Sequence, residues 1–345
     1  MKIITVKQYH EALKMVKQPL VIMGSPGLCK TSLPDQVARE LGGVSHVIPV
    51  AQFSEPGDML GCPYDVEVES EDGSLSRKTA YATPDYFPTK GKGFVIIDDF
   101  NRANTLIVQS LLHLAQYREF GSYRLPELVY DDKGNWISGF KLVFTGNMSE
   151  EGEKDYIVND VDDAFFSRVI SYQLKFDKLM WGKWARSVNI DEKFISFILK
   201  NNELVNLDDN PRAFSNGFLE LKGVDDLDRI EFIMSGTVKC YPLLRSWLEK
   251  EWSELNFDSN DVYDDNKHKN LIKIFKGASE DGMMLFAERI ATLNVKDINK
   301  KQQESLRKFF HLMRDVDRER FMVAFIPVNN ECHTLTDDSL FNELV

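Results

Sequence analysis

Residues 19–33 read PLVIMGSPGLCKTSL, and this stretch decides the fold. The run from Pro19 to Met23 is apolar throughout, which is typical of a strand buried on both faces of a parallel sheet. Glycines follow at once at Gly24 and Gly27. Apolar residues then recur at the four-residue spacing of a helix with an apolar seam, at Leu33, Val37 and Leu41. The stretch therefore predicts a strand, a glycine-rich turn and a helix in direct succession.

The turn has the composition of a phosphate-binding loop. Backbone N–H groups in a glycine-rich turn surround phosphate oxygens, and the positive end of the following helix adds to the attraction. Lys30 is placed to reach the β- and γ-phosphates of a nucleotide, and the hydroxyl of Thr31 to hold Mg²⁺. The full pattern has glycine where Cys29 stands. The candidate nucleotide-binding residues are Gly24, Ser25, Pro26, Gly27, Leu28, Cys29, Lys30, Thr31 and Ser32.

A second apolar run ends in two carboxylates. The residues from Phe94 to Ile97 are apolar, and Asp98 and Asp99 follow them. A buried strand that ends in aspartate places the carboxylate at the carboxyl edge of the sheet, where open α/β sheets bind ligands. We expect Asp98 to contact Mg²⁺ through water, and Asp99 to orient a water molecule against the γ-phosphate.

Three further polar residues are candidates for the same chemistry. Asn147 follows a predicted strand, so its amide would face the same edge and hold the attacking water, although a loop asparagine is ordinarily a turn former. Arg168 precedes the last predicted strand, where it is either an ordinary surface arginine or a donor to the γ-phosphate of a neighbouring molecule. Arg212 begins a helix behind a proline and has the same surface alternative.

Alternating strands and helices continue to about residue 175. The other predicted strands are 46–50, 93–97, 141–145 and 169–174, and the other predicted helices are 7–17 and 105–119. Such an alternation implies a parallel sheet covered on both faces. Two stretches, 64–81 and 127–140, alternate around Asp72-Gly73 and Lys133-Gly134 and predict inserted hairpins.

After Leu174 the pattern is helical, and an acidic stretch at 258–265 interrupts it. We therefore expect three parts. These are an α/β core over 1–175, a helical domain over 176–250 and a C-terminal helical region of unknown role over 251–345.

Composition limits the class of protein. The chain has 345 residues, a formal net charge of −12 and 43% apolar residues, and no apolar run is long enough to span a bilayer. The excess of negative charge argues against a protein whose main role is to coat nucleic acid. The cysteines form no CxxC pair, which disfavours a disulfide scaffold or a zinc site and favours a reducing cytoplasm: Cys29, Cys62, Cys240 and Cys332.

Taken in order, seven segments resemble an AAA+ ATPase, and within that superfamily the MoxR group in the dynein-related branch. They are GSPGLCKT (24–31), EPGDMLG (55–61), FVIIDDFNRAN (94–104), SLLHLAQYREFGSYRLPE (110–127), FTGN (144–147), DDAFFSRV (162–169) and PRA (211–213). The resemblance covers residues 1 to about 222. It implies a P-loop NTPase core with a parallel sheet and inserted β-hairpins, followed by an α-helical lid and a helical C-terminal part.

The resemblance also implies roles for single residues and a mode of action. It places Walker A at 24–31, Walker B at Asp98 and Asp99, and sensor 1 at Asn147. Arg168 matches the arginine finger that acts on the neighbouring subunit, and Arg212 matches sensor 2. Members of the family bind ATP and Mg²⁺ in hexameric rings. They remodel or activate a protein substrate, often alongside a von Willebrand-type partner, with hairpins that face the pore.

Two departures from the family pattern bear on turnover. Cys29 replaces a glycine, and a small side chain is tolerated there if the position is helical in φ. Asp99 replaces the usual glutamate and is one methylene shorter. A misplacement of about 1 Å costs on the order of 10²-fold in rate, so nucleotide binding is a firmer expectation than fast hydrolysis.

Three functions remain open at this point. The first is an ATP hydrolase that remodels a protein partner, and the second is a nucleotide-gated assembly or scaffold module with little or no hydrolysis. The third is a nucleic-acid translocase, which the mixed charge of the predicted hairpins disfavours. Those charges are Glu67, Glu69, Glu71 and Asp72 against Arg77, Lys78 and Lys133.

Overall fold

The computed structural model describes residues 1–69, 73–148, 161–206, 209–250, 252, 257–293 and 298–331. The chain divides into two compact units, Met1–Phe176 and Asp177–Val345. Among the described residues, no helix combines the length and the apolar character needed to cross a membrane.

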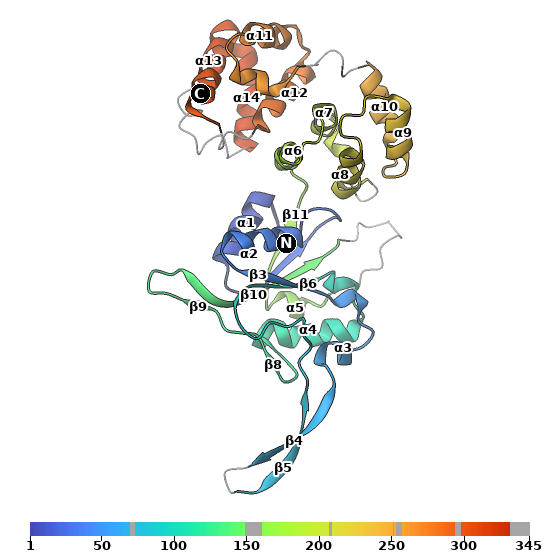
Figure 1. The fold of residues 1–345 in the computed structure, drawn as a ribbon, viewed down its shortest axis with the longest axis vertical. Helices are drawn as coiled ribbons and strands as arrows, with labels where there is room; N and C mark the ends of the chain where they lie inside the picture. Colours follow the sequence, from blue (N-terminus) through green and yellow to red (C-terminus); the bar gives the residue numbers. More distant parts are fainter. Residues whose placement is uncertain are drawn as a thin grey trace. The chain divides into compact units, whose positions relative to one another are not determined.

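The first unit is built on a parallel sheet with the strand order β1-β11-β2-β10-β6-β3 (Figure 1). The strands are β1 (Lys2–Ile4), β2 (Leu20–Met23), β3 (Val44–Pro49), β6 (Lys92–Asp98), β10 (Trp136–Gly146) and β11 (Ile170–Leu174). The predicted α/β fold with a parallel sheet is confirmed. Only β1 was not predicted, because three residues are too few to show a period.

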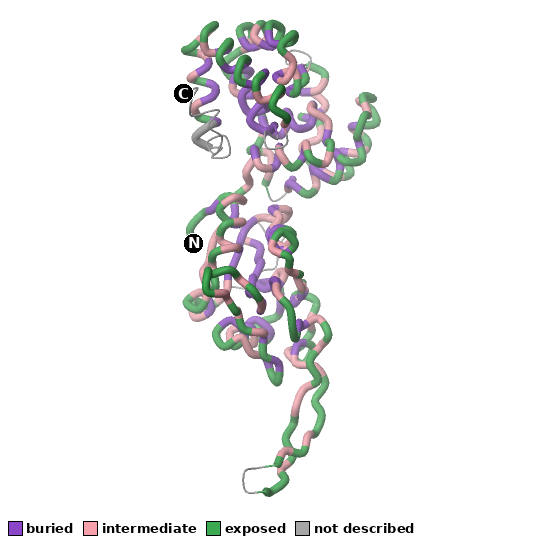
Figure 2. Tube along the Cα trace, turned by 60° about the vertical axis from the view of Figure 1, so that its left-hand side comes forward, coloured by how far each residue is buried: buried purple, intermediate pink, exposed green. Residues whose placement is uncertain are grey.

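Helices cover both faces of this sheet, as the alternation predicted. On one face lie α1 (Val6–Met15) and α2 (Ser32–Glu40), and on the other α3 (Pro56–Leu60), α4 (Thr105–Tyr117) and α5 (Asp163–Phe166). Successive strand residues point to opposite faces, so Ile96 packs against the first pair of helices and Ile97 against the second group. The buried residues accordingly concentrate in the sheet (Figure 2).

Both predicted hairpins are present. β4 (Pro63–Glu69) pairs antiparallel with β5 (Leu75–Tyr81), and this hairpin stands away from the sheet with most of its residues exposed (Figure 2). Its turn residues 70–72 lie outside the described part of the chain. β9 (Val129–Tyr130) pairs with the first residues of β10. A third hairpin, between β7 (Glu119–Phe120) and β8 (Tyr123–Arg124), was missed because each of its strands has only two residues.

The described residues of the second unit form helices and no strand, as expected after Leu174. The helices are α6 (Lys178–Ser187), α7 (Glu192–Lys200), α8 (Pro211–Glu220), α9 (Leu227–Ser235), α10 (Tyr241–Lys250), α11 (His268–Gly277), α12 (Glu280–Ala291), α13 (Lys300–Val316) and α14 (Arg318–Glu331). Short polar side chains cap several helix starts, because the first N–H groups of a helix lack partners within it. Asp177, Asn210 and Ser279 each accept such a bond. The finer division of this unit near residue 250 stays a prediction.

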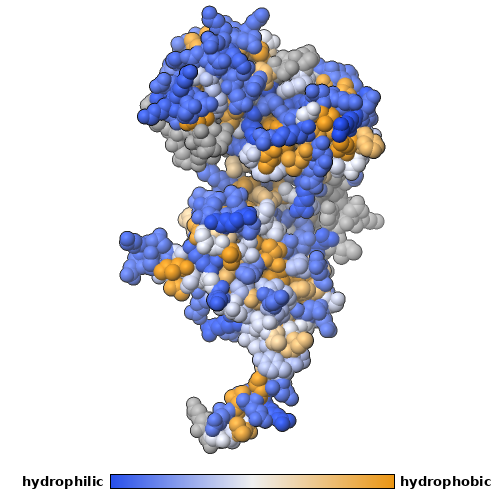
Figure 3. Space-filling model, in the orientation of Figure 1, coloured by the Kyte–Doolittle hydropathy of each residue, from blue (hydrophilic) through white to orange (hydrophobic). Residues whose placement is uncertain are grey.

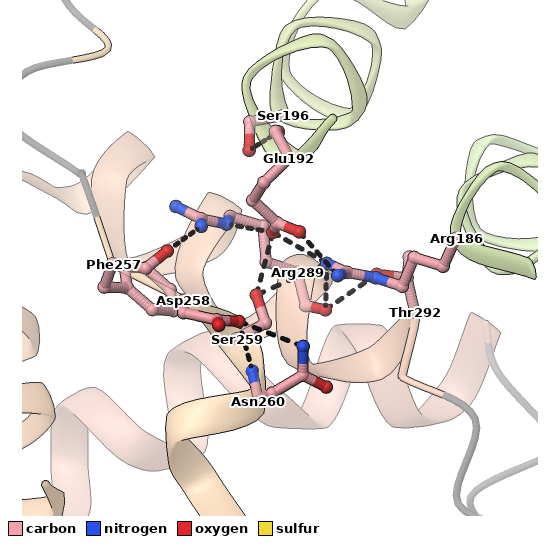
Figure 4. Close-up of polar contacts among 9 residues, drawn as sticks. All are labelled: Arg186, Glu192, Ser196, Phe257, Asp258, Ser259, Asn260, Arg289 and Thr292. Carbon is pink, nitrogen blue, oxygen red and sulfur yellow. Dashed lines mark hydrogen bonds and ion pairs between the residues drawn. The ribbon is translucent and has the colours of Figure 1, made fainter. Parts of the chain in front are cut away.

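A buried ion network joins residues on either side of position 250 (Figure 4). Arg289 of α12 is fully buried, and its Nε donates to Glu192 Oε1 at 2.7 Å. Arg186 Nη2 donates to the same oxygen at 2.7 Å, and Ser259 Oγ at 2.8 Å. Burial opposes ionisation of Glu192, but the two guanidinium groups outweigh it and hold the pKa of this carboxyl below its ordinary value. The carboxylate is therefore the shared counter-ion of two arginines.

Removal of that carboxylate should destabilise the second unit strongly. We expect Glu192→Ala to lower the free energy of unfolding by about 3–5 kcal/mol, because Arg289 would stay buried without the carboxylate to which its Nε donates. Urea unfolding reads this out, followed by the fluorescence of the tryptophans of the unit, Trp181, Trp184, Trp247 and Trp252. Glu220→Ala is the matched control, since Glu220 is exposed and has no ion pair among the described residues. Equal losses in the two variants would contradict the role of the network.

Candidate nucleotide-binding site

The glycine-rich turn joins β2 to α2 at the carboxyl edge of the sheet. The Gly24 N–H donates to the Gly146 carbonyl at 3.2 Å, which ties the turn to the end of the neighbouring strand β10. A Cβ atom at Gly24 would lie 2.6 Å from the Leu174 carbonyl oxygen, so only glycine fits there. Gly27 has a φ of 81°, in the left-handed region that glycine enters without strain. The two glycines thus shape a turn whose backbone stays close to two strand ends.

Lys30 is held inside this turn. Its side chain is only 7% exposed, and Nζ donates to the carbonyls of Gly24 at 2.8 Å and Ser25 at 2.9 Å. Nζ also donates to Asn147 Oδ1 at 2.9 Å. The buried Tyr9 hydroxyl donates to the Lys30 carbonyl at 2.9 Å, and burial raises the pKa of Tyr9 well above its ordinary value. The ammonium group is therefore held inside the turn that the sequence predicts to bind phosphate.

Asp98 ends β6 beside the hydroxyl of Thr31. Asp98 Oδ1 accepts from Thr31 Oγ1 at 2.6 Å and from Thr145 Oγ1 at 2.5 Å. Thr145, which is fully buried in β10, also accepts from the Asp99 N–H at 3.3 Å. A carboxylate and a hydroxyl side by side are the hard oxygen ligands that Mg²⁺ prefers. The donor set therefore fits this ion, with Thr145 as a support that the sequence analysis did not identify.

Asp99 lies next to Asp98, and both of its oxygens have donors. Asn147 Nδ2 donates to Asp99 Oδ1 at 2.9 Å, and Arg102 Nη1 to Oδ2 at 3.3 Å. Lys30 can only donate and the carboxylate accepts, so only one orientation of the Asn147 amide satisfies both. Asn147 thus connects the lysine of the turn to the second carboxylate.

Asn101 fixes the backbone of this connecting residue. It is 3% exposed, its Nδ2 donates to the Asn147 carbonyl at 2.7 Å, and its Oδ1 accepts from the Asn147 N–H at 3.1 Å. Asn101 lies in the segment FVIIDDFNRAN (94–104), which predicts no role for it. Its partner is 46 residues away, so only the position of a polar residue just after a buried strand could have indicated it.

Cys29 adopts a backbone conformation that its side chain disfavours. Its φ is 51°, so the condition under which a small side chain is tolerated, a right-handed helical φ, is not met. A residue with a Cβ costs about 1–2 kcal/mol in this left-handed region, which explains why the full pattern has glycine here. Burial raises the pKa of the thiol to about 11, although Lys30 opposes the shift. Cys29 is therefore protonated at neutral pH.

The other predicted residues lie outside this network. Leu28 is buried in the apolar cluster beneath α1 and α2, and Ser32 begins α2. Arg168 follows α5 in the first unit, is exposed, and bonds Gln116 of α4. Arg212 is exposed on the first turn of α8 in the second unit, so its role toward a nucleotide stays a prediction.

Together, a glycine turn between strand and helix, a lysine within it and carboxylates at the next strand end define the class of nucleotide-binding α/β proteins. Residues 19–169, less than half of the chain, match the family described as the AAA domain of the dynein-related subfamily. This stretch is accordingly similar to the AAA domains of that subfamily. No curated protein matches the chain.

Several solved structures resemble the chain distantly. NtrX from Brucella abortus, in complex with ATP, has 10% identity and a TM-score of 0.38 over 70% of this chain and 61% of that one. A putative ATPase from Cytophaga hutchinsonii has 14% identity and a TM-score of 0.31 over 87% and 78%. The RuvB Holliday junction branch migration motor from Thermotoga maritima has 17% identity and a TM-score of 0.34 over 79% and 76%. The chain thus covers less than two thirds of the NtrX chain.

The left-handed backbone at Cys29 predicts an unusual order of stability. We expect Cys29→Gly to be more stable than Cys29→Ala by about 1 kcal/mol, because alanine keeps the strained Cβ and glycine removes it. At Ala12 within α1, glycine should instead cost about 1 kcal/mol relative to alanine. Chemical denaturation of the three variants and the wild type measures both differences. A Cys29→Gly protein that is less stable than Cys29→Ala would refute the assigned conformation.

The position of Thr145 predicts a defect in metal binding. We expect Thr145→Val to raise the Mg²⁺ concentration for half-maximal ATP binding by about tenfold, since Asp98 loses the donor that orients it. Titration of Mg²⁺ at fixed ATP, monitored with a fluorescent ATP analogue, gives this value. Thr79→Val, at an exposed position of β5, is the matched control and should leave the titration unchanged. An unchanged midpoint in Thr145→Val would refute the supporting role.

Proposed function

We propose that this protein is an ATP hydrolase that works with Mg²⁺ in an oligomeric ring and uses hydrolysis to remodel or activate a protein partner. The observation that carries the proposal is the continuous connection from Lys30 through Asn147 to Asp99. It joins the Lys30 ammonium group, which would bind phosphate oxygens, and the Asp99 carboxylate, which would orient a water molecule, in one hydrogen-bonded chain. A glycine-rich turn without a catalytic role does not require such a connection.

The turn 24–31 would hold the triphosphate through its N–H groups, with Lys30 against the β- and γ-phosphates. Thr31 and Asp98 would hold Mg²⁺, which when bound neutralises charge that develops on the phosphates. Thr145 keeps Asp98 oriented by its hydroxyl. These residues bind the nucleotide and need not move far, because their mutual contacts already place them at one edge of the sheet.

Asp99 and Asn147 would orient the water molecule that attacks the γ-phosphorus. In that step the water oxygen bonds to phosphorus, the bond to the ADP oxygen breaks, and Asp99 accepts the proton of the water. Arg102 and Asn147 hold the two oxygens of Asp99 in place. Such positioning partly offsets the shorter reach of aspartate.

We further propose a MoxR-like AAA+ ring, with six subunits as the expected number. Arg168 would reach the γ-phosphate of a neighbouring subunit, and Arg212 would sense the nucleotide from the helical part. The support is the ordered motif set from the turn to residue 213, together with the exposure of Arg168. The predicted cytoplasmic location fits a ring that draws on cellular ATP.

A protein partner fits the exposed β4–β5 hairpin better than a nucleic acid does. Tyr64 is 50% exposed and Leu75 71%, so the hairpin offers apolar contacts among charged ones (Figure 3). Glu67 faces Arg77 across the hairpin, and the carboxylates of β4 (Asp65, Glu67 and Glu69) outnumber the cations of β5 (Arg77 and Lys78) by one. Acidic groups repel phosphates but accept a polypeptide, so a protein substrate or a von Willebrand-type partner is the expected ligand.

A nucleotide-gated assembly module with slow or absent turnover is the alternative. Cys29 and Asp99 both have a left-handed φ, 51° and 52°, and the usual residues at these positions, by family resemblance, are glycine and glutamate. The backbone strain at Cys29 and the short side chain of Asp99 are both more compatible with nucleotide binding than with rapid ATP hydrolysis.

Steady-state phosphate release at several protein concentrations tests the proposal. We expect the rate per subunit to rise with concentration and Arg168→Ala to lower it by about 10³-fold, since a shared arginine stabilises charge on the transferred phosphoryl group. Lys30→Ala should abolish ATP binding. Arg307→Ala, at an exposed position of α13, is the control and should behave as the wild type.

Three outcomes would overturn or redirect the proposal. A wild type that binds no ATP and matches Lys30→Ala would overturn it. ATP binding with negligible turnover at every concentration, and with candidate partners added, would favour the assembly module. Salt-sensitive DNA binding that depends on the β4–β5 hairpin would instead favour a translocase.

A further inference from the structure

The guanidinium group of Arg168 is held in one orientation by its own subunit. Its Nε donates to Gln116 Oε1 at 2.7 Å. Its Nη1 donates to the Ala164 carbonyl and to Ser167 Oγ, the latter at 3.3 Å. Because the guanidinium is planar, contacts at Nε and Nη1 fix the direction of the third nitrogen.

That third nitrogen, Nη2, has no hydrogen-bond partner among the residues that the structure describes, and Arg168 is exposed. Two N–H donors are therefore not used by the described residues, and they can bind a group supplied from outside this unit. An exposed arginine without such contacts would sample many rotamers, each of which points these donors elsewhere.

Gln116 is suited to orient this group. It lies on the exposed side of α4, whose opposite side is fixed in the core by Ile107, Leu111 and Leu114. The Gln116 oxygen therefore has a rigid support. As an amide it accepts a hydrogen bond without neutralising the positive charge, which a carboxylate at this position would do.

We propose that Gln116 is a positioning residue that aims Arg168 at the nucleotide of the neighbouring subunit. This inference rests on the proposed function, in which Arg168 completes a shared site. In this role Gln116 would contact neither the nucleotide nor the attacking water and would act only through the guanidinium group of Arg168. It sets how often the two remaining donors of Arg168 point in the productive direction, so it affects turnover and not the binding of ATP in its own subunit.

Gln116→Met tests this role, because methionine is close in size and lacks the acceptor. At saturating protein concentration we expect kcat to fall by about three- to tenfold, the range that corresponds to one lost hydrogen bond, with the KM for ATP unchanged. The concentration that gives half-maximal specific activity should also stay the same. Gln109→Met is the matched control, since Gln109 is exposed two turns earlier on α4 and has no hydrogen bond among the described residues.

A double-mutant cycle separates positioning from a structural effect. In an Arg168→Lys background, whose side chain has no Nε–H, Gln116→Met should lower the residual rate no further. A similar fall in both backgrounds, or a wild-type kcat in the single variant, would overturn the inference. If Arg168→Ala keeps the wild-type rate at every protein concentration, the proposal of a site shared between subunits is refuted. Loss in Arg168→Ala with no effect of Gln116→Met refutes only the role of Gln116.

Discussion

The buried ammonium group of Lys30 is the constraint around which the first unit is organised. A lysine with 7% of its surface exposed needs acceptors, because an unpaired charge is costly to bury. Two acceptors come from the turn itself, and the third is the amide oxygen of Asn147, 117 residues away in the chain. That third contact requires β2 and β10 to be neighbours with their carboxyl ends level, which the parallel pairing of Met23 with Gly146 provides.

Much of this arrangement is predictable because its signals are local. Apolar runs, glycines and a four-residue helix period placed the turn, the main strands and Asp98 without any knowledge of contacts. Thr145, Asn101 and Tyr9 could not be found in this way, since each acts on a residue at least 21 positions away. Thr145 looks like any β-branched strand residue until the end of β6 lies beside it. Their chemistry depends on the strand order, which no local pattern specifies.

The second unit illustrates the same limit more strongly. Its helices follow from periodicity, but the acidic stretch at 258–265 seemed to interrupt the fold. In the structure it contains a short 3-10 helix, Ser259–Tyr263, in which Val262 is fully buried. What holds this segment is Glu192, which accepts from Ser259 and from Arg289, 97 residues further along. A lone glutamate at the start of a helix suggests only favourable interaction with the helix dipole, so its pairing with two arginines was not predictable.

The polar network at the sheet edge also accounts for backbone strain there. Cys29 and Asp99 are both non-glycine residues with left-handed φ, a conformation that persists only where the surroundings impose it. Three hydrogen bonds impose this conformation on Asp99. Its backbone N–H donates to Thr145, and its two carboxylate oxygens accept from Asn147 and Arg102. The hydrogen bonds that orient the carboxylate therefore also stabilise its unfavourable backbone. The same contacts thus position the Asp99 carboxylate and stabilise its strained backbone. A substitution that removes one of them, such as a change at Thr145, affects the carboxylate position and the backbone together.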